Sequence, residues 1–162
     1  MEQSTNNILQ FFRLGLINGF ITKSDVISWV DKEIELNPDI SNELIDISLS
    51  GSKSKNDFID SVTSLTGYNL TETAAKLFLG TLYNKYINKE ISLESLSSSL
   101  NYISKYEPLN EQENIKLWML EDELELAKKQ IWGTVEQVEK NILAFLTPYK
   151  EYKLLTKNDN SA

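Results

Sequence analysis

The chain has 162 residues, of which 41% are hydrophobic and 25% are charged, a balance typical of a globular protein that buries one core. It contains neither cysteine nor histidine, which excludes disulfides, thiolate catalysis, histidine general bases and the commonest metal ligands. Its net charge of −8 argues against nucleic acid as a partner, because phosphate binding requires a basic surface, and it favours a basic protein instead.

Apolar residues recur at steps of three and four along the chain, a spacing typical of helices that bury one face. Capping residues and Gly or Pro breakers divide this pattern into eight segments. The expected helices cover residues 9–19, 24–37, 40–50, 57–67, 71–86, 92–106, 110–132 and 134–147. Strand-type alternation is weak, so the sequence predicts an all-α fold of about eight helices, packed as antiparallel hairpins in an irregular bundle or array.

The first predicted helix ends near Gly19, and Ser24 is the expected cap of the second, which Pro38 terminates. The third ends at Gly51, and the fourth begins at Asp57 after a polar loop. These four segments carry most of the acidic excess of the first half of the chain, with eight acids against three bases in residues 1–50.

The later helices have clear starting signals, because Thr71, Ser92, Asn110 and Thr134 each stand where a cap is needed. The seventh helix is the longest. Its expected inward seam consists of Leu117, Leu120, Leu124, Ala127 and Ile131. We expect residues 1–155 to form a single helical domain and residues 156–162 to be a flexible C-terminal tail.

The seventh helix also contains the stretch WMLEDELELAKKQ, residues 118–130, with four carboxylates within five residues. If the leucine seam faces inward, Glu121, Asp122 and Glu125 face outward. A di-iron site would need inward Glu-x-x-His pairs and a calcium loop a central glycine, so we expect no metal or cofactor. Two interpretations stay open: a solvated face, and a surface that binds a basic partner with Trp118 as an aromatic anchor.

The second interpretation includes acids from the eighth helix, because helices seven and eight are expected to be neighbours. The predicted partner-binding residues are Glu111, Trp118, Glu121, Asp122, Glu125, Glu136 and Glu139. No residue pattern in the chain predicts a catalytic site, and the absence of histidine, cysteine and a phosphate-binding loop argues against an enzyme.

The N-terminal sequence MEQSTNNILQFFRLG lacks the basic start and apolar core of a secretory signal, and no apolar run is long enough for a bilayer span. We therefore expect a cytoplasmic protein without membrane association. The sequence does not specify the oligomeric state.

The segment FFRLGLINGFITKSDVISWVDKEIELNPDI, residues 11–40, resembles the N-terminal helical hairpin of immunity proteins that protect bacteria from polymorphic or contact-dependent growth inhibition toxins. The resemblance implies a non-enzymatic cytosolic inhibitor that binds one toxin domain, often a nuclease, and blocks its active site or a nearby surface. It transfers no functional residue, because these proteins share no catalytic motif.

An acidic helical surface would complement the basic substrate groove of a nuclease and accelerate the encounter of the two proteins. The alternative is an acidic helical adaptor, or a self-associating interaction protein, with no toxin partner.

Overall fold

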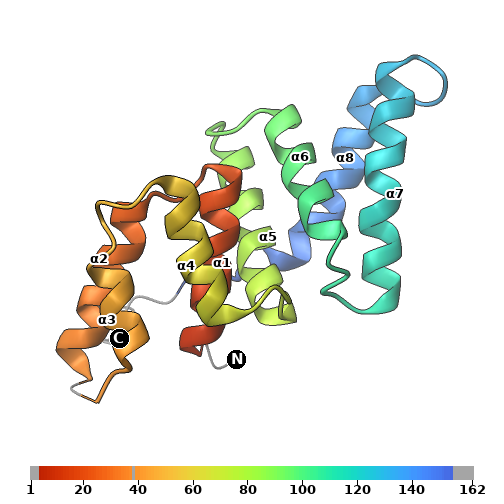
Figure 1. Cartoon of the computed structure of the whole chain (residues 1–162). Helices are drawn as coiled ribbons and strands as arrows, with labels where there is room; N and C mark the ends of the chain where they lie inside the picture. Colours follow the sequence, from red (N-terminus) through yellow and green to blue (C-terminus); the bar gives the residue numbers. More distant parts are fainter. Residues whose placement is uncertain (1–3, 38, 155–162) are drawn as a thin grey trace. The chain divides into compact units, whose positions relative to one another are not determined.

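The structure is a computed structural model that describes residues 4–37 and 39–154, and these residues are helical without any strand (Figure 1). The α-helices are α1 (Thr5–Asn18), α2 (Lys23–Leu36), α3 (Asn42–Ser48), α4 (Lys55–Thr66), α5 (Glu72–Ile87), α6 (Leu93–Ser104), α7 (Glu111–Lys128) and α8 (Val135–Leu146), followed by the 3₁₀ helix η1 (Thr147–Tyr149). The predicted all-α fold of about eight helices is confirmed. The tail predicted for residues 156–162 lies outside the described residues.

The chain divides into two compact units at the junction of Asn69 and Leu70. The first unit contains α1 to α4, and the second contains α5 to α8 and η1. The expectation of one domain for residues 1–155 stays a prediction, and each unit is described by itself.

In the first unit α1 packs against α4, while α3 packs against both α2 and α4. The buried side chain of Arg13 on α1 is central to this packing. Its guanidinium donates to the carbonyl oxygens of Tyr68 and Asn69 at 3.2 Å each, to that of Gly67, and to Thr66 Oγ1 at 3.4 Å. The cation thus satisfies carbonyl groups beyond the end of α4, where the helix dipole favours positive charge.

In the second unit α7 lies between α6 and α8, and α5 packs against α6, α8 and η1. The helices α7 and α8 form an antiparallel hairpin (Figure 1). At Gly80 of α5 the chain that follows η1 comes very close. A Cβ atom at this position would lie 2.2 Å from the carbonyl oxygen of Tyr152 and 2.5 Å from that of Tyr149. Only glycine therefore permits this contact between α5 and the C-terminal segment.

Four helix starts differ from the prediction. Helix α1 begins at Thr5 rather than at residue 9, and α3 begins at Asn42 rather than at residue 40. The starts of α2 and α4 differ for a shared reason. The cap of α2 is Thr22 rather than Ser24, and Thr22 and Asp25 form a reciprocal capping box. The hydrogen bonds from Thr22 lower the pKa of Asp25. Similarly, α4 begins after Ser54, whose hydroxyl accepts from the backbone of Asp57 at 3.2 Å. In both helices the acid stands three residues after the cap, where it accepts hydrogen bonds from the capping residue.

The predicted seam of α7 is wrong at its last member. The helix ends at Lys128, and Gln130 adopts a positive φ of 56°. This left-handed residue turns the chain out of the helical path, so Ile131 is 66% exposed instead of buried.

Candidate functional site

Helix α7 is held in place by one apolar side and leaves its other side open. Leu117, Leu120, Leu124 and Ala127 are buried, as the sequence predicts, and the neighbouring helices are α6 and α8. Asn110 caps the helix by accepting from the backbone of Glu113 at 3.0 Å. With its buried side occupied, the opposite side of α7 faces solvent.

That opposite side is unusually apolar for a solvent-exposed helix. Trp118 is 69% exposed, Met119 53% and Ile115 52%, and Leu126 is also exposed. Their spacings of three, four and seven or eight residues bring them to one side of the helix. Isolated exposed apolar residues are common, but a contiguous set of this kind marks interaction surfaces.

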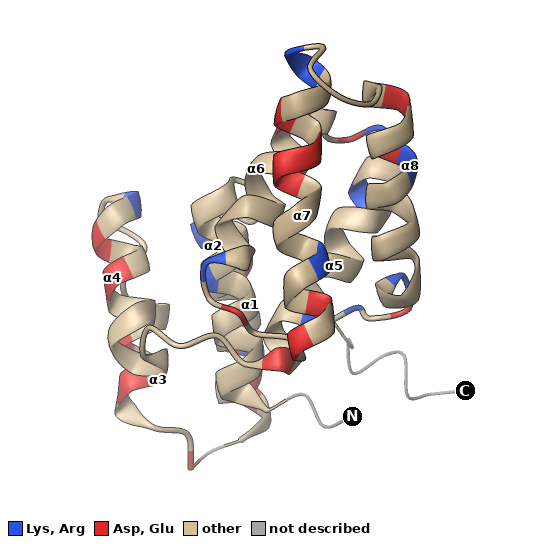
Figure 2. Cartoon of the chain, turned by 90° about the vertical axis from the view of Figure 1, so that its right-hand side faces the viewer, with Lys and Arg blue, Asp and Glu red and all other residues tan. Residues whose placement is uncertain are grey.

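Acidic residues stand among these apolar side chains, and Figure 2 shows acidic positions recurring along α7. Glu111, Asp122 and Glu125 are all exposed. Glu125 lies 3.7 Å from the ammonium of Lys129 in an exposed ion pair of little energetic value. We define the α7 outer face as Glu111, Ile115, Trp118, Met119, Asp122, Glu125 and Leu126.

Two residues predicted for partner binding are used inside the unit instead. Glu121 is half-buried and accepts a hydrogen bond from the Asn101 side chain of α6. Glu139 of α8 is half-buried and accepts from the hydroxyl of Tyr86 on α5. Burial, followed by the hydrogen bond to Glu139 and its charge, raises the pKa of Tyr86 to about 12.

The outward orientation expected for Glu121 is therefore wrong. This residue stands one turn from both Leu117 and Leu124, at the border of the buried seam, and so faces α6. Glu136 is exposed in the first turn of α8. Of the seven predicted residues, the structure thus brings Glu111, Trp118, Asp122 and Glu125 together on the α7 outer face.

The sequence prediction missed the apolar members of this face. Ile115, Met119 and Leu126 form a second apolar stripe beside the leucine seam, and its spacing is visible in the sequence. In the turn after α7, Ile131 and Trp132 are each 66% exposed. The exposed apolar surface of the α7–α8 hairpin is therefore larger than the sequence prediction, which named only Trp118, indicated.

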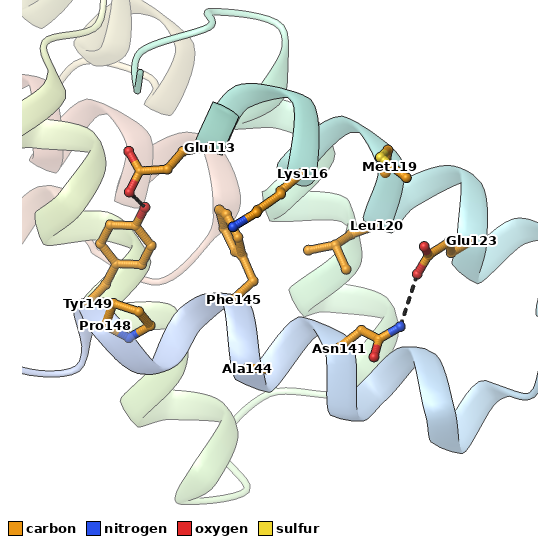
Figure 3. A pocket seen from close by; sticks show the side chains of 10 residues that line it. All are labelled: Glu113, Lys116, Met119, Leu120, Glu123, Asn141, Ala144, Phe145, Pro148 and Tyr149. Carbon is orange, nitrogen blue, oxygen red and sulfur yellow. Dashed lines mark hydrogen bonds between the residues drawn. The ribbon is translucent and has the colours of Figure 1, made fainter. Parts of the chain in front are cut away.

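A cavity of about 390 Å³ lies between α7 and α8 (Figure 3). Leu120, Ala144, Phe145, Pro148 and Tyr149 provide most of its apolar lining. Of these lining residues, Tyr149 is buried, with 3% of its surface exposed. Burial raises the pKa of the Tyr149 hydroxyl, and the hydrogen bond that this hydroxyl donates to Glu113 raises it further.

The polar lining of the cavity consists of Glu113, Lys116, Glu123 and Asn141, with Met119 at the side shared with the α7 outer face. Tyr149 donates to Glu113 at 2.6 Å, and Asn141 donates to Glu123 at 3.2 Å. Figure 3 shows these two hydrogen bonds at opposite ends of the cavity.

Within residues 4–37 and 39–154, no group of three or more acidic side chains is arranged to hold a metal ion. No helix in this part of the chain combines the length and apolar character needed to cross a membrane. Comparisons with protein-family models, curated proteins and solved structures found no match. The resemblance of residues 11–40 to immunity proteins accordingly stays a prediction.

Residues quoted for that resemblance have structural roles in the first unit. Arg13 holds the chain after α4, and a Cβ atom at Gly15 would lie 2.3 Å from Ile21 Cδ1. The Phe12 and Trp29 rings pack edge to face with centroids 5.4 Å apart. These contacts explain the residues without a partner, so the candidate binding surface is better sought on α7.

Proposed function

We propose that this chain is a non-enzymatic binding protein that recognises a basic protein through the α7 outer face, and that its partner is a bacterial toxin domain. The observation that carries the binding proposal is the exposed apolar stripe around Trp118, interspersed with Glu111 and Asp122. The toxin as partner rests on the resemblance of residues 11–40.

The energy available from this face is large enough for specific binding. A tryptophan side chain presents up to about 250 Å², so the 69% exposure of Trp118 leaves about 170 Å² to be removed from water. At about 25 cal/mol per Å² this burial contributes about 4 kcal/mol before the costs of association. Trp118 thus has the size and position of an interface hot spot.

Charge distinguishes a basic partner from a second copy of the chain. Glu111 and Asp122 form no ion pair within the described residues. A two-fold dimer built on this face would bring like charges together, which is unfavourable. A basic protein would instead neutralise these carboxylates while it covers the apolar side chains, and this supports a basic partner over the self-associating alternative.

The test uses the toxin domain encoded beside this gene, with binding measured by calorimetry and protection by growth of cells that express the toxin. We expect Trp118→Ala to weaken binding by about 30-fold or more, which corresponds to about 2 kcal/mol for a hot-spot residue. Tyr68→Ala is the matched control, because Tyr68 is an exposed aromatic residue of the first unit. It should bind normally.

The charges are tested by replacing Glu111, Asp122 and Glu125 with lysine. Because these are rim charges, we expect a slower association rate that high salt partly masks. A charge-matched variant replaces Asp31, Glu35 and Glu43 of the first unit with lysine. If that variant alone loses binding, recognition lies on the first unit, and the proposed role of α7 is wrong.

A further inference from the structure

We propose that the cavity between α7 and α8 is a binding site for a basic side chain, an arginine or a lysine, that the partner inserts as an anchor. This inference rests on the proposed function, which it extends from an exposed face to a defined pocket. The cavity combines an apolar lining with a carboxylate that a hydrogen bond holds in place at its edge.

The apolar lining suits the methylene stem of such a side chain. Leu120 and Phe145 face the cavity from α7 and α8 (Figure 3), and Ala144, an exposed residue of α8, contributes only a methyl group to the lining. The volume of about 390 Å³ accommodates an extended side chain, and the opening lets it enter from solvent. Long basic side chains bury their aliphatic stems readily while the charged end finds a polar group.

The charged end has a specific acceptor in Glu123. One carboxylate oxygen of this half-buried residue accepts from Asn141 at 3.2 Å, which orients the group at the edge of the cavity. No lysine or arginine of the described residues forms an ion pair with it. Since a carboxylate accepts about four hydrogen bonds, it retains the capacity to bind a guanidinium or an ammonium.

The other end of the cavity does not offer the same opportunity. Glu113 already accepts two hydrogen bonds, one from Tyr149 at 2.6 Å and one from Asn110 at 2.6 Å, so it has less remaining capacity than Glu123. Lys116 lies nearer this end (Figure 3) and would repel a cation there. An anionic occupant would meet two carboxylates for a single ammonium. The charges therefore favour a cation whose head points to Glu123.

The cavity is continuous with the α7 outer face, because Met119 belongs to both. A protein that covers Trp118 is thus placed to insert a side chain beside Met119. Interfaces gain most of their energy from a few such anchors in well-packed pockets.

The test is an NMR titration of the isotope-labelled full chain with N-acetyl-arginine methylamide and with its apolar counterpart, N-acetyl-norleucine methylamide. We expect the arginine probe to shift the amides of Leu120, Glu123 and Asn141 along a saturable curve, and to bind at least fivefold more tightly than the norleucine probe. Equal binding of the two probes would show that the cavity does not select a cation, which contradicts the proposal. The absence of shifts at the cavity would show that neither probe binds there and would also overturn the proposal.

Three variants locate the interaction. Glu123→Gln should weaken the arginine probe at least fivefold and leave the norleucine probe unchanged, whereas Glu136→Gln, an equal change of charge outside the cavity, should alter neither. Ala144→Leu adds three carbon atoms to the cavity lining and should weaken the binding of both probes. Undiminished binding by a folded Ala144→Leu variant would show that the probes bind elsewhere, and Glu123→Gln decides the question if that variant does not fold.

Failure here is distinguishable from failure of the proposed function. Probe binding at the cavity together with normal toxin binding by Trp118→Ala would contradict the proposed face alone. Loss of toxin binding by Trp118→Ala without any probe binding would contradict the anchor pocket alone.

Discussion

Replacing Gly80 with alanine tests how the C-terminal segment is attached to α5. The new Cβ would lie 2.2 Å from the Tyr152 carbonyl oxygen and 2.5 Å from that of Tyr149. Ordinary carbon–oxygen contacts are about 3.3 Å or longer, so the segment must move away by about 1 Å. Neither obstacle is a flexible side-chain end, because both are backbone atoms.

The expected loss of stability follows from three contributions. Overpacking of this kind costs about 1–3 kcal/mol. The shift also weakens the hydrogen bond from Asn84 Nδ2 to the Lys150 carbonyl, 3.3 Å long, and the packing of Tyr149, for about 1–2 kcal/mol more. Alanine returns about 1 kcal/mol through its higher helix propensity. We therefore expect the free energy of unfolding to fall by about 1–4 kcal/mol.

The assay is urea denaturation followed by circular dichroism, with Gly51→Ala as the matched control. A Cβ at Gly51 would meet only Ile27 Cδ1, at an ordinary 3.5 Å, so that variant should change the free energy of unfolding by less than about 1 kcal/mol. If Gly80→Ala were as stable as the wild type or more stable, the close approach of the C-terminal segment to α5 would be refuted.

Three further predictions concern stability and pH. Arg13→Met should lower the free energy of unfolding by about 1–3 kcal/mol, because the carbonyl groups of Tyr68 and Asn69 lose a charged donor. A denaturant midpoint equal to that of the wild type would show that these hydrogen bonds do not stabilise the fold. Gln130→Gly should raise the free energy of unfolding by up to about 1 kcal/mol, because Gln130 has a φ of 56°, which glycine adopts without strain. A lower denaturant midpoint than that of the wild type would argue against strain at this residue. Because the pKa of Tyr149 is raised in the folded protein, the unfolded state releases this proton first as pH increases, so stability present at neutral pH should be lost above about pH 10. In unfolding curves recorded across this pH range, Tyr149→Phe should lose less stability than the wild type as pH increases. Part of the loss should remain in this variant, because the pKa of Tyr86 is also raised, to about 12.

Features that depend on neighbours within one helical turn were predictable from the sequence. Thr71, Ser92, Asn110 and Thr134 cap their helices as expected, because each side chain bonds to a backbone group three residues later. The buried part of the α7 seam followed from the same short spacing. The wrong starts of α2 and α4, predicted at Ser24 and Asp57, arose where several polar residues competed for the cap.

The site depends on contacts between residues distant in sequence. Asp122 and Glu121 are adjacent and chemically similar, yet one is exposed and the other is bonded to Asn101 of α6. Periodicity alone does not separate them, because the exposure of a border position is decided by how closely the next helix packs. Glu139 faces Tyr86, which lies 53 residues earlier, for the same reason.

The sequence by itself determined that this chain forms amphipathic helices, where the last four of them begin, and that α7 combines a buried seam with an acidic side. Only the tertiary structure decided which carboxylates are exposed and that a cavity lies along part of the interface between α7 and α8. A cavity exists only where two packed surfaces leave the space between them unfilled. Around Ala144 and Phe145 the surfaces of α7 and α8 leave such a space. That space depends on the packing of whole helices, which no local spacing of residues specifies.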